Sequence, residues 1–229
     1  MSLNVIILGP PGAGKGTQAE RFSRARGIPK ISTGDILRDA VAANSDLGLR
    51  AKSIMDRGEL LGDDVMIGIV RDRLDRADAR SGFVLDGFPR TVAQAEALDV
   101  VMRGRDPLIV VDIAVPEVEL LRRLASRLVC ERCGTNALPG STSCVRCGGR
   151  LVPRADDNLA VVRERLAVYH RQSRPLVEYY RTRPTFRAID GAQPADRVTD
   201  DLVAAIEAVG GGATLGASAR SEGAHGGRA

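Results

Sequence analysis

The sequence is poor in the residues and runs that mark membrane-spanning and single-strand-binding proteins. It has no Trp, three Tyr and four Phe, too few rings for a surface on which nucleic-acid bases stack. Its longest apolar runs, residues 5–8 and 108–115, fall far short of the roughly 18 residues that a transmembrane helix needs. The N-terminal residues lack the basic and apolar stretches of a signal peptide. We therefore expect a cytoplasmic protein that has neither a membrane nor a nucleic acid as its partner.

Lysine is scarce, and arginine carries almost all of the basic charge. Of 33 basic residues only Lys15, Lys30 and Lys52 are lysines, and the formal net charge is +4. Guanidinium groups suit bidentate binding of phosphate, but so many cannot all bind ligands, and we expect most to be solvated. The apolar share of 44% and charged share of 27% are ordinary for a globular protein. The length of 229 residues favours one domain with insertions or two small domains.

The only four cysteines, Cys130, Cys133, Cys144 and Cys147, form two CxxC pairs joined by ten residues. Such pairs are typical of a Zn²⁺ site in which four thiolates surround the ion. Four protein ligands leave no open position, so the metal would be structural and would hold a segment that has almost no apolar core. Disulfides are the main alternative, and a cytosolic environment disfavours them. Fe²⁺ and Co²⁺ remain alternatives to Zn²⁺ in a thiolate site.

Strand-like and helix-like patterns alternate along most of the chain. Short apolar runs predict β-strands at residues 4–8, 30–32, 83–85, 108–115 and 185–189. Residue patterns predict helices at 14–26, 63–75, 91–104, 116–127, 156–180 and 194–209. Because the strands are apolar throughout, the alternation favours an α/β fold with a doubly wound, parallel, five-stranded sheet.

Two segments interrupt this alternation and one follows it. Residues 32–61 are helical in pattern and contain no strand of their own, and residues 128–153 are rich in Gly, Cys, Pro and Ser. We predict that both are insertions in the core. Residues 210–229 are rich in Gly and Ala without any period, so we predict a disordered tail.

A phosphate-binding loop follows the first predicted strand. Residues 9–17 read GPPGAGKGT, which matches the G-x4-G-K-[ST] pattern between a strand and a helix. The glycines let backbone N–H groups point inward at anionic oxygens, and the helix N-terminus adds positive charge. Lys15 can reach the outer phosphates, and the Thr17 hydroxyl can support Mg²⁺. The loop therefore predicts a nucleoside triphosphate as ligand.

A second group of polar residues follows the strand at 83–85. Asp86 ends that strand, at the sheet edge where ligands of open α/β sheets bind, and a carboxylate there can hold Mg²⁺ through water. Arg90 comes four residues later and would project from the same edge. Gln94 lies a further helical turn along, and a Gln amide can pair bidentately with an adenine edge.

Three segments together resemble the adenylate kinases, a family of nucleoside monophosphate kinases. They are GPPGAGKGT (9–17), ISTGDILR (31–38) and LDGFPR (85–90), and the resemblance covers residues 3–209. It implies a P-loop kinase core (1–31, 62–125 and 158–209), a helical NMP-binding insertion (32–61) and a small zinc-ribbon lid (126–157). It also implies the reaction Mg-ATP + AMP ⇌ 2 ADP. The implied partners are ATP, AMP and ADP, the cofactors are Mg²⁺ and structural Zn²⁺, and the enzyme is expected to be a monomer.

The resemblance assigns individual residues to the two nucleotides and to the transfer step. For ATP they are Gly12, Ala13, Gly14, Lys15, Gly16, Thr17, Arg127 and Gln193. For AMP they are Thr33, Arg38, Glu59, Leu60, Leu61, Gly87, Phe88, Pro89, Arg90, Gln94, Arg154 and Arg165. The catalytic set is Lys15, Asp86, Arg90, Arg123, Arg127, Arg154 and Arg165. Phosphoryl transfer needs preorganised positive charge more than a general base, so the presence of only two histidines is no obstacle.

The sequence departs from the family pattern in the lid and at one helix start. The link between the CxxC pairs is short, and residues 136–138 replace a common Tyr-His. Ser126 stands where a Gly is usual. Gly62 replaces a usual Thr or Pro, and we expect Asp63 to cap the following helix instead.

Two other functions fit parts of the sequence. One is a UMP or CMP kinase of the same fold, against which Thr33 and Gln94 favour adenine. The other is a P-loop nucleotide sensor whose zinc ribbon binds nucleic acid through Arg132, Arg146, Arg150 and Arg154, although the resemblance already assigns Arg154 to the active site. The ribbon lacks the interleaved aromatic residues that such binding would favour.

Overall fold

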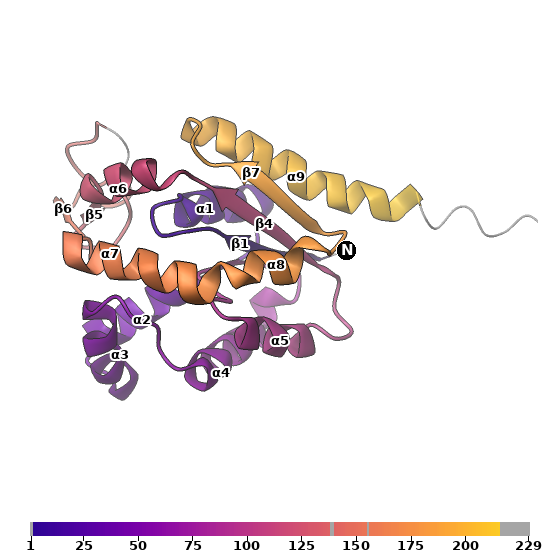
Figure 1. Cartoon of the computed structure of the whole chain (residues 1–229), viewed down its shortest axis with the longest axis horizontal. Helices are drawn as coiled ribbons and strands as arrows, with labels where there is room; N and C mark the ends of the chain where they lie inside the picture. Colours follow the sequence, from indigo (N-terminus) through magenta and orange to yellow (C-terminus); the bar gives the residue numbers. More distant parts are fainter. Residues whose placement is uncertain (1, 138–139, 155, 216–229) are drawn as a thin grey trace, which may run out of the picture.

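A parallel sheet lies at the centre of the fold (Figure 1). It has five strands in the order β2-β3-β1-β4-β7. The computed structural model describes residues 2–137, 140–154 and 156–215. The strands are β1 (Leu3–Leu8), β2 (Lys30–Ser32), β3 (Gly82–Asp86), β4 (Leu108–Ala114) and β7 (Phe186–Asp190). Every neighbouring pair in this sheet is parallel. The predicted fold class is confirmed, and each strand end lies within one residue of its predicted position.

The strand register brings three carboxyl ends together. Ile7 of β1 lies opposite Asp86 of β3, and Leu8 lies opposite Asp112 of β4. The chain leaves β1 at Gly9, so the following loop begins between the ends of its two neighbouring strands. This is the edge at which parallel α/β sheets bind ligands.

Helices cover both faces of the sheet (Figure 1). Two separate apolar clusters are buried in the structure. Side chains of one cluster come from α1 (Lys15–Arg26), α6 (Glu117–Ala125), α7 (Leu159–Val168) and α9 (Ala195–Leu215). Side chains of the other come from α4 (Asp63–Leu74), the short η1 (Ala77–Ala79), α5 (Val92–Val101) and α8 (Pro175–Arg181).

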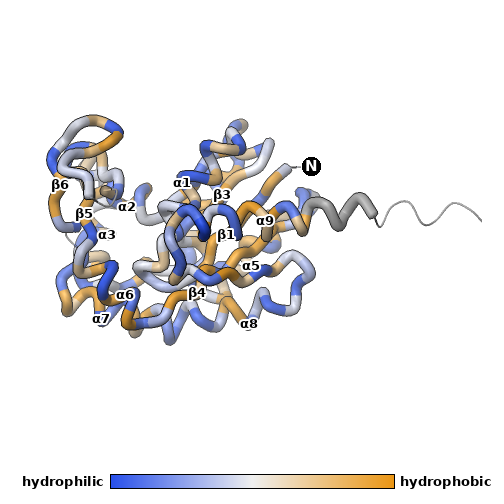
Figure 2. Tube along the Cα trace, turned by 90° about the horizontal axis from the view of Figure 1, so that it is seen from above, coloured by the Kyte–Doolittle hydropathy of each residue, from blue (hydrophilic) through white to orange (hydrophobic). Residues whose placement is uncertain are grey.

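Successive residues of the central strands alternate between these clusters. Val5 and Ile7 belong to one, while Ile6 and Leu8 belong to the other. Because both faces are covered, the strands are apolar without interruption, and Figure 2 shows hydrophobic residues concentrated along them.

The first insertion is a pair of helices, α2 (Thr33–Ala42) and α3 (Asp46–Asp56). Ser32 caps α2 and Ser45 caps α3 through their side-chain oxygens. The helices approach so closely that a Cβ at Gly48 would lie 2.0 Å from the carbonyl oxygen of Ala40. A glycine is therefore required at this helix crossing.

The second insertion holds a small antiparallel sheet of β5 (Leu128–Cys130) and β6 (Leu151–Pro153). Figures 1 and 2 show these strands set apart from the central sheet, beside α6 and α7 in the first view. The same backbone turn occurs twice in this insertion. The N–H of Gly134 donates to the carbonyl of Cys130 at 2.9 Å, and the N–H of Gly148 donates to that of Cys144 at 2.8 Å.

The continuous helix predicted at 156–180 is wrong in two respects. Asn158 caps α7 by accepting from the N–H of Val161 at 3.0 Å, so the helix begins later. A π-helical segment, η2 (Tyr169–Ser173), then separates α7 from α8. Pro175 has no N–H to continue the α-helical bonding, and the N–H of Arg174 donates instead to the carbonyl of Tyr169 at 2.8 Å. The wider π-helical turn accommodates this interruption of the α-helical hydrogen bonding.

The last helix runs further than predicted. We expected it to end at residue 209, but α9 continues to Leu215, so the predicted disorder does not begin at Gly210. Burial of Val198, Leu202 and Ile206 stabilises its first turns, and adding residues to a formed helix costs less than starting one. The rest of the predicted tail, residues 216–229, lies outside the described residues. Within the described ranges no helix is long and apolar enough to cross a membrane.

Candidate active site

The loop between β1 and α1 has a conformation that glycine makes possible. Gly9 has a φ of +136°, and a Cβ there would lie 2.7 Å from the carbonyl oxygen of Ile113. Gly14, with a φ of +93°, is the N-cap of α1, which begins at Lys15. The structure thus places the predicted loop between a strand end and a helix N-terminus, the arrangement that binds phosphate.

Lys15 turns back onto this loop. Its ammonium donates to the carbonyl oxygens of Gly9 at 2.7 Å and Pro10 at 2.8 Å. The residue as a whole is half-buried, but its ammonium is enclosed, and this desolvation lowers the pKa of Lys15 to about 7 despite the attraction of Asp86. Nearby Arg90 and Arg165 also lower it. A phosphate group would supply the negative charge that the loop carbonyls provide only in part.

Two carboxylates follow the neighbouring strands. A Cβ added to Gly16 would lie 3.1 Å from Oδ2 of Asp86, so this carboxylate lies against the first turn of α1, which also carries Thr17. Hard oxygen groups of this kind suit Mg²⁺. Asp112 is 8% exposed, and its Oδ1 has no partner within the part of the chain that the structure describes. Burial raises the pKa of Asp112, although Lys15 opposes the shift.

A second binding region is a cavity of about 80 Å³ between the helical insertion and the sheet edge. Of the residues predicted for AMP, those that line it are Thr33, Arg38, Glu59, Leu60, Leu61, Gly87, Arg90, Gln94, Arg154 and Arg165. Phe88 and Pro89 do not line it, and Phe88 is instead a core residue that is 2% exposed. The loop that follows β3 therefore sends some side chains to the cavity and others to the core.

The backbone carbonyl of Gly87 joins the insertion to this edge. The Thr33 hydroxyl donates to it at 2.8 Å, and Nε of Arg90 donates to it at 2.8 Å. Arg38 pairs with Asp35 one turn before it on α2. Thr33 and Arg90, which are distant in sequence, are thus fixed by one acceptor.

Asp63 does not cap α4 as expected. Gly62 occupies the N-cap without a side-chain hydrogen bond, and Asp63 is the first residue of the helix. Its carboxylate accepts instead from the Thr91 hydroxyl at 2.9 Å and from Nε2 of Gln94 at 2.8 Å. The expectation is wrong because the start of α5 supplies donors that the sequence around Asp63 does not show.

Three arginines predicted to bind phosphate converge on two adjacent carboxylates. Arg127 donates twice to Asp157, from Nε and Nη2 at 2.5 Å each. Arg154 donates to Asp156 at 2.6 and 3.0 Å. Arg165 reaches both carboxylates, at 3.2 Å to Asp156 and 3.0 Å to Asp157. The pair of aspartates holds three guanidinium groups together at the base of the second insertion.

Burial shifts the pKa values of several charged groups around this cluster. Burial lowers the pKa of Arg90, and it lowers that of Arg165 to about 10. Burial alone would raise the pKa of Asp156, but Arg154 and Arg165 hold it below its ordinary value. Arg165 and Asp156 therefore stay charged at neutral pH. Such a cluster suits a polyanion whose charge moves during a reaction.

Arg123, on α6, and Gln193 meet at a different place, the turn after β7. Nη2 of Arg123 donates to the carbonyl of Gly191 at 2.9 Å, and its Nε donates to Glu119 at 2.7 Å. Gln193 donates to the carbonyl of Asp190 at 3.0 Å. The structure brings both predicted residues together around residues 190–193 and not around the aspartate pair.

The four cysteines form a compact cluster in the second insertion. Their sulfur atoms all lie within 4.8 Å of one another, and Cys130 and Cys147 approach to 3.5 Å. These separations are too long for a disulfide, which needs about 2.05 Å, and all four cysteines are free. A tetrahedral ion bound at about 2.3 Å needs sulfurs about 3.8 Å apart, so the cluster has the size and donor set of a thiolate metal site.

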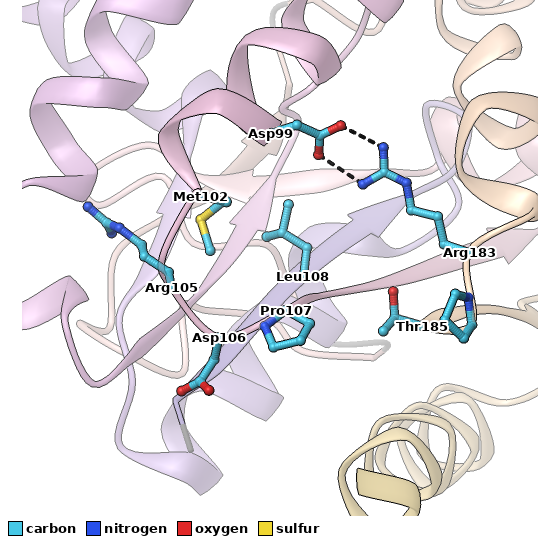
Figure 3. A pocket seen from close by; sticks show the side chains of 9 residues that line it. Asp99, Met102, Arg105, Asp106, Pro107, Leu108, Arg183 and Thr185 are labelled. Carbon is cyan, nitrogen blue, oxygen red and sulfur yellow. Dashed lines mark hydrogen bonds and ion pairs between the residues drawn. The ribbon is translucent and has the colours of Figure 1, made fainter. Parts of the chain in front are cut away.

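A separate hollow of about 320 Å³ lies at the opposite, amino-terminal edge of the sheet, near the start of β4 (Figure 3). Its charged groups already have partners. Arg183 forms two hydrogen bonds with Asp99, at 2.8 and 2.6 Å, and Asp106 accepts from Ser2. With its charges satisfied internally, this hollow offers little to an ionic ligand.

The structure adds residues that the sequence analysis did not assign. Further lining of the smaller cavity comes from Gly34, Leu37, Met55, Gly58, Met66 and Asp156. The adjacent pair Asp156-Asp157, beside Arg154, was a visible sequence signal for ion pairing. Asp112 interrupts an apolar strand and was a similar signal.

The fold and the site together define a P-loop phosphotransferase, with a phosphate-binding type of loop before α1 and a separate cavity at the helical insertion. The family model for adenylate kinase matches residues 7–185. The chain is 47% identical over 214 residues to an adenylate kinase of Magnetococcus marinus, which covers 89% of this chain and 100% of that protein. It is 46% identical over 215 residues to one of Archaeoglobus fulgidus (90% and 99% covered) and 47% over 209 residues to one of Staphylococcus epidermidis (88% and 97%). The chain belongs to the adenylate kinase family, a family of nucleoside monophosphate kinases.

Proposed function

We propose that this chain catalyses Mg-ATP + AMP ⇌ 2 ADP and so balances the adenine nucleotides. One observation carries the proposal. Arg90 and Arg165 line the cavity at the helical insertion and also lie close enough to Lys15 to lower its pKa. These two arginines can therefore touch the phosphates of both nucleotides at the point where they meet.

In the proposed reaction a phosphate oxygen of AMP attacks the γ-phosphorus of ATP, and the bond from that phosphorus to the bridging oxygen breaks. No proton has to move for this exchange, so positioning and electrostatic stabilisation supply most of the catalysis. Lys15, Arg90, Arg127, Arg154 and Arg165 provide the positive charge. No histidine lines the cavity among the described residues, which agrees with a mechanism that needs no general base.

The two nucleotides have separate sites in this proposal. The phosphates of ATP lie on Gly12, Ala13, Gly14, Lys15, Gly16 and Thr17, with Arg127. Arg123 lies near these phosphates, and the backbone of Gln193 contacts the base. AMP occupies the cavity, where the Gln94 amide pairs with adenine. When bound with ATP, Mg²⁺ neutralises charge on its phosphates, and Asp86 and Thr17 are the groups that would hold it, directly or through water.

We further propose that Cys130, Cys133, Cys144 and Cys147 hold a structural Zn²⁺. The segment has almost no apolar core of its own, since its buried side chains within the described residues are Cys130 and Cys144. A closed four-thiolate site would fix its fold. We assign residues 126–157 as a lid that closes over ATP, residues 32–61 as the AMP-binding insertion, and 1–31, 62–125 and 158–209 as the core.

The test is ADP formation from Mg-ATP with AMP, UMP, CMP or GMP in turn, beside a tube without acceptor. We expect ADP with AMP alone. Comparable rates with UMP or CMP would favour a pyrimidine nucleotide kinase. ADP without any acceptor would indicate hydrolysis, and its absence from every tube would favour a nucleotide sensor.

We also propose a cytoplasmic monomer that acts on free nucleotides without a nucleic-acid or membrane partner. Light scattering at several concentrations tests its oligomeric state.

A further inference from the structure

Gln94 is held from both ends of its side-chain amide. It is 1% exposed, its Oε1 accepts from the N–H of Arg90 at 2.8 Å, and its Nε2 donates to Oδ1 of Asp63 at 2.8 Å. A backbone N–H can only donate and a carboxylate can only accept. These two partners therefore fix which end of the amide is oxygen and which is nitrogen.

Asp63 is itself fixed by α5. Its Oδ2 accepts from the Thr91 hydroxyl at 2.9 Å, and Thr91 caps the same helix by accepting from the N–H of Gln94 at 3.2 Å. Asp63, Thr91 and Gln94 thus form a closed ring of hydrogen bonds that joins the start of α4 to the start of α5. Asp63 does not line the cavity, whereas Gln94 does, so Asp63 acts on a ligand only through the amide.

The fixed amide retains one N–H and one oxygen lone pair for a ligand. Adenine offers an amino donor at position 6 and an acceptor at N1, whereas hypoxanthine and guanine offer an acceptor at position 6 and a donor at N1. The order of donor and acceptor is therefore reversed between these bases. If the base is held in one position, a Gln94 amide that cannot rotate can pair with only one of these two donor–acceptor orders.

We infer that Asp63 is a positioning residue that sets selectivity for 6-amino over 6-oxo purine monophosphates by preventing rotation of the Gln94 amide. The inference rests on the proposed function only in that it takes the cavity as the site of the acceptor nucleotide. If the amide rotated, its oxygen would face the Asp63 carboxylate and its NH₂ group would face the N–H of Arg90. Both contacts would be repulsive, and Asp63 supplies the charged one.

The experiment compares AMP with IMP, which differ at position 6 and in the proton at N1. The dissociation constants of both are measured by calorimetry, and kcat/KM of both with Mg-ATP, for the native chain and for Asp63→Asn. An Asn at this position can accept from or donate to either end of the Gln94 amide. We expect the preference for AMP over IMP, taken as the ratio of their dissociation constants or of their kcat/KM values, to fall by about tenfold. This is the effect of losing roughly one charge-assisted hydrogen bond.

Asp64→Asn is the matched control. Asp64 is the next residue in the first turn of α4, is exposed and has no hydrogen bond to Gln94 in the described structure. It loses the same charge at the same helix end, and we expect its AMP to IMP ratio to equal that of the native chain. In the Gln94→Ala background, Asp63→Asn should change the ratio no further, because two residues acting through one contact are not additive.

An unchanged ratio in Asp63→Asn, or an equal loss of binding for AMP and IMP, would overturn the inference, since a purely structural role weakens both alike. If Asp63→Asn does not fold, Thr91→Val and Thr91→Ser replace it; the ratio should narrow in the first and persist in the second. Failure of the proposed function has a different result: the native chain would bind AMP but form no ADP. Failure of the native chain to bind either nucleotide would overturn both.

Discussion

Arg127 donates two hydrogen bonds of 2.5 Å to Asp157 across 30 positions of intervening chain. This pair joins the two ends of the second insertion, at the point where it leaves the core and returns. The Asp157 side chain is 4% exposed and that of Arg127 is 20% exposed, so water screens the pair little. The same carboxylate also binds Arg165, which connects the base of the insertion to α7.

We predict that Asp157→Asn destabilises the ligand-free protein by about 2–3 kcal/mol, because it leaves two partly buried guanidinium groups without their shared anion. Denaturant unfolding measures the loss, and hydrogen exchange should show faster exchange at residues 128–153. Glu131→Gln is the control, since its pair with Arg150 is on the exposed surface and surface pairs contribute little. Equal stability of the native chain and Asp157→Asn would contradict the prediction.

We predict that Arg165→Ala lowers kcat by about 10³-fold while the fold is kept, because a single arginine at the transferring phosphoryl group contributes that much. Arg165→Lys should recover part of the activity, since a point charge replaces a bidentate donor. Steady-state kinetics and circular dichroism measure both effects. Arg163→Ala, an exposed position on the same helix, should keep full activity. Near-native turnover in Arg165→Ala would remove Arg165 from the transfer step.

We predict that binding of Mg-ATP at pH 8 takes up close to one proton. Burial lowers the pKa of Lys15 to about 7, so without a ligand the Lys15 amine is mostly neutral at pH 8. Bound phosphates would favour its charged form again. Calorimetry in two buffers of different ionisation enthalpy measures the uptake, which should vanish at pH 6 and in Lys15→Arg. Identical heats in both buffers at pH 8 would show that Lys15 is already charged.

The same lowered pKa makes a prediction for the empty protein. Between about pH 7 and the ordinary lysine value of 10.5, the unfolded chain holds a proton that the native chain has lost. Lys15 therefore makes stability increase with pH through this window, and it contributes no pH dependence below it. The free energies of unfolding of the native chain and of Lys15→Met are measured at pH 6.5 and 9.5. From the lower to the higher pH, the native chain should gain stability relative to the variant.

We predict that the protein binds one Zn²⁺ per chain and that Cys130→Ser/Cys133→Ser loses it. The remaining two thiolates cannot form a closed tetrahedral site, and without it the segment has little to hold its fold. Elemental analysis measures the metal, and a lower melting temperature should accompany its loss. Arg132→Ala changes an exposed residue between the same two cysteines and should keep both metal and stability. Full retention of zinc by the double variant would contradict the assignment.

The sequence predicted those parts of the protein in which neighbouring residues determine the backbone. The five strands, the phosphate loop before α1 and the CxxC pairs are all local patterns. The helix predicted at 156–180 failed because Asn158 and Pro175 alter backbone hydrogen bonding within a segment whose residues otherwise suit a helix. The prediction that the last helix ends at 209 was wrong because three glycines in a row do not stop a helix that packing already stabilises.

By itself, the sequence determined the class of fold, the loop that binds phosphate and the types of residue at the site, because spacing along the chain sets which side chains share a strand end or a turn. Only the tertiary structure decided which of these groups meet. Asp63 pairs with Gln94 across 31 positions, and Asp157 with Arg127 across 30, because helix packing and strand register bring them within hydrogen-bond distance. Burial follows from the same packing, and it shifts the pKa of Lys15 and leaves Asp112 with an unpaired oxygen. Desolvation depends on what surrounds a group in space, which its sequence neighbours do not specify.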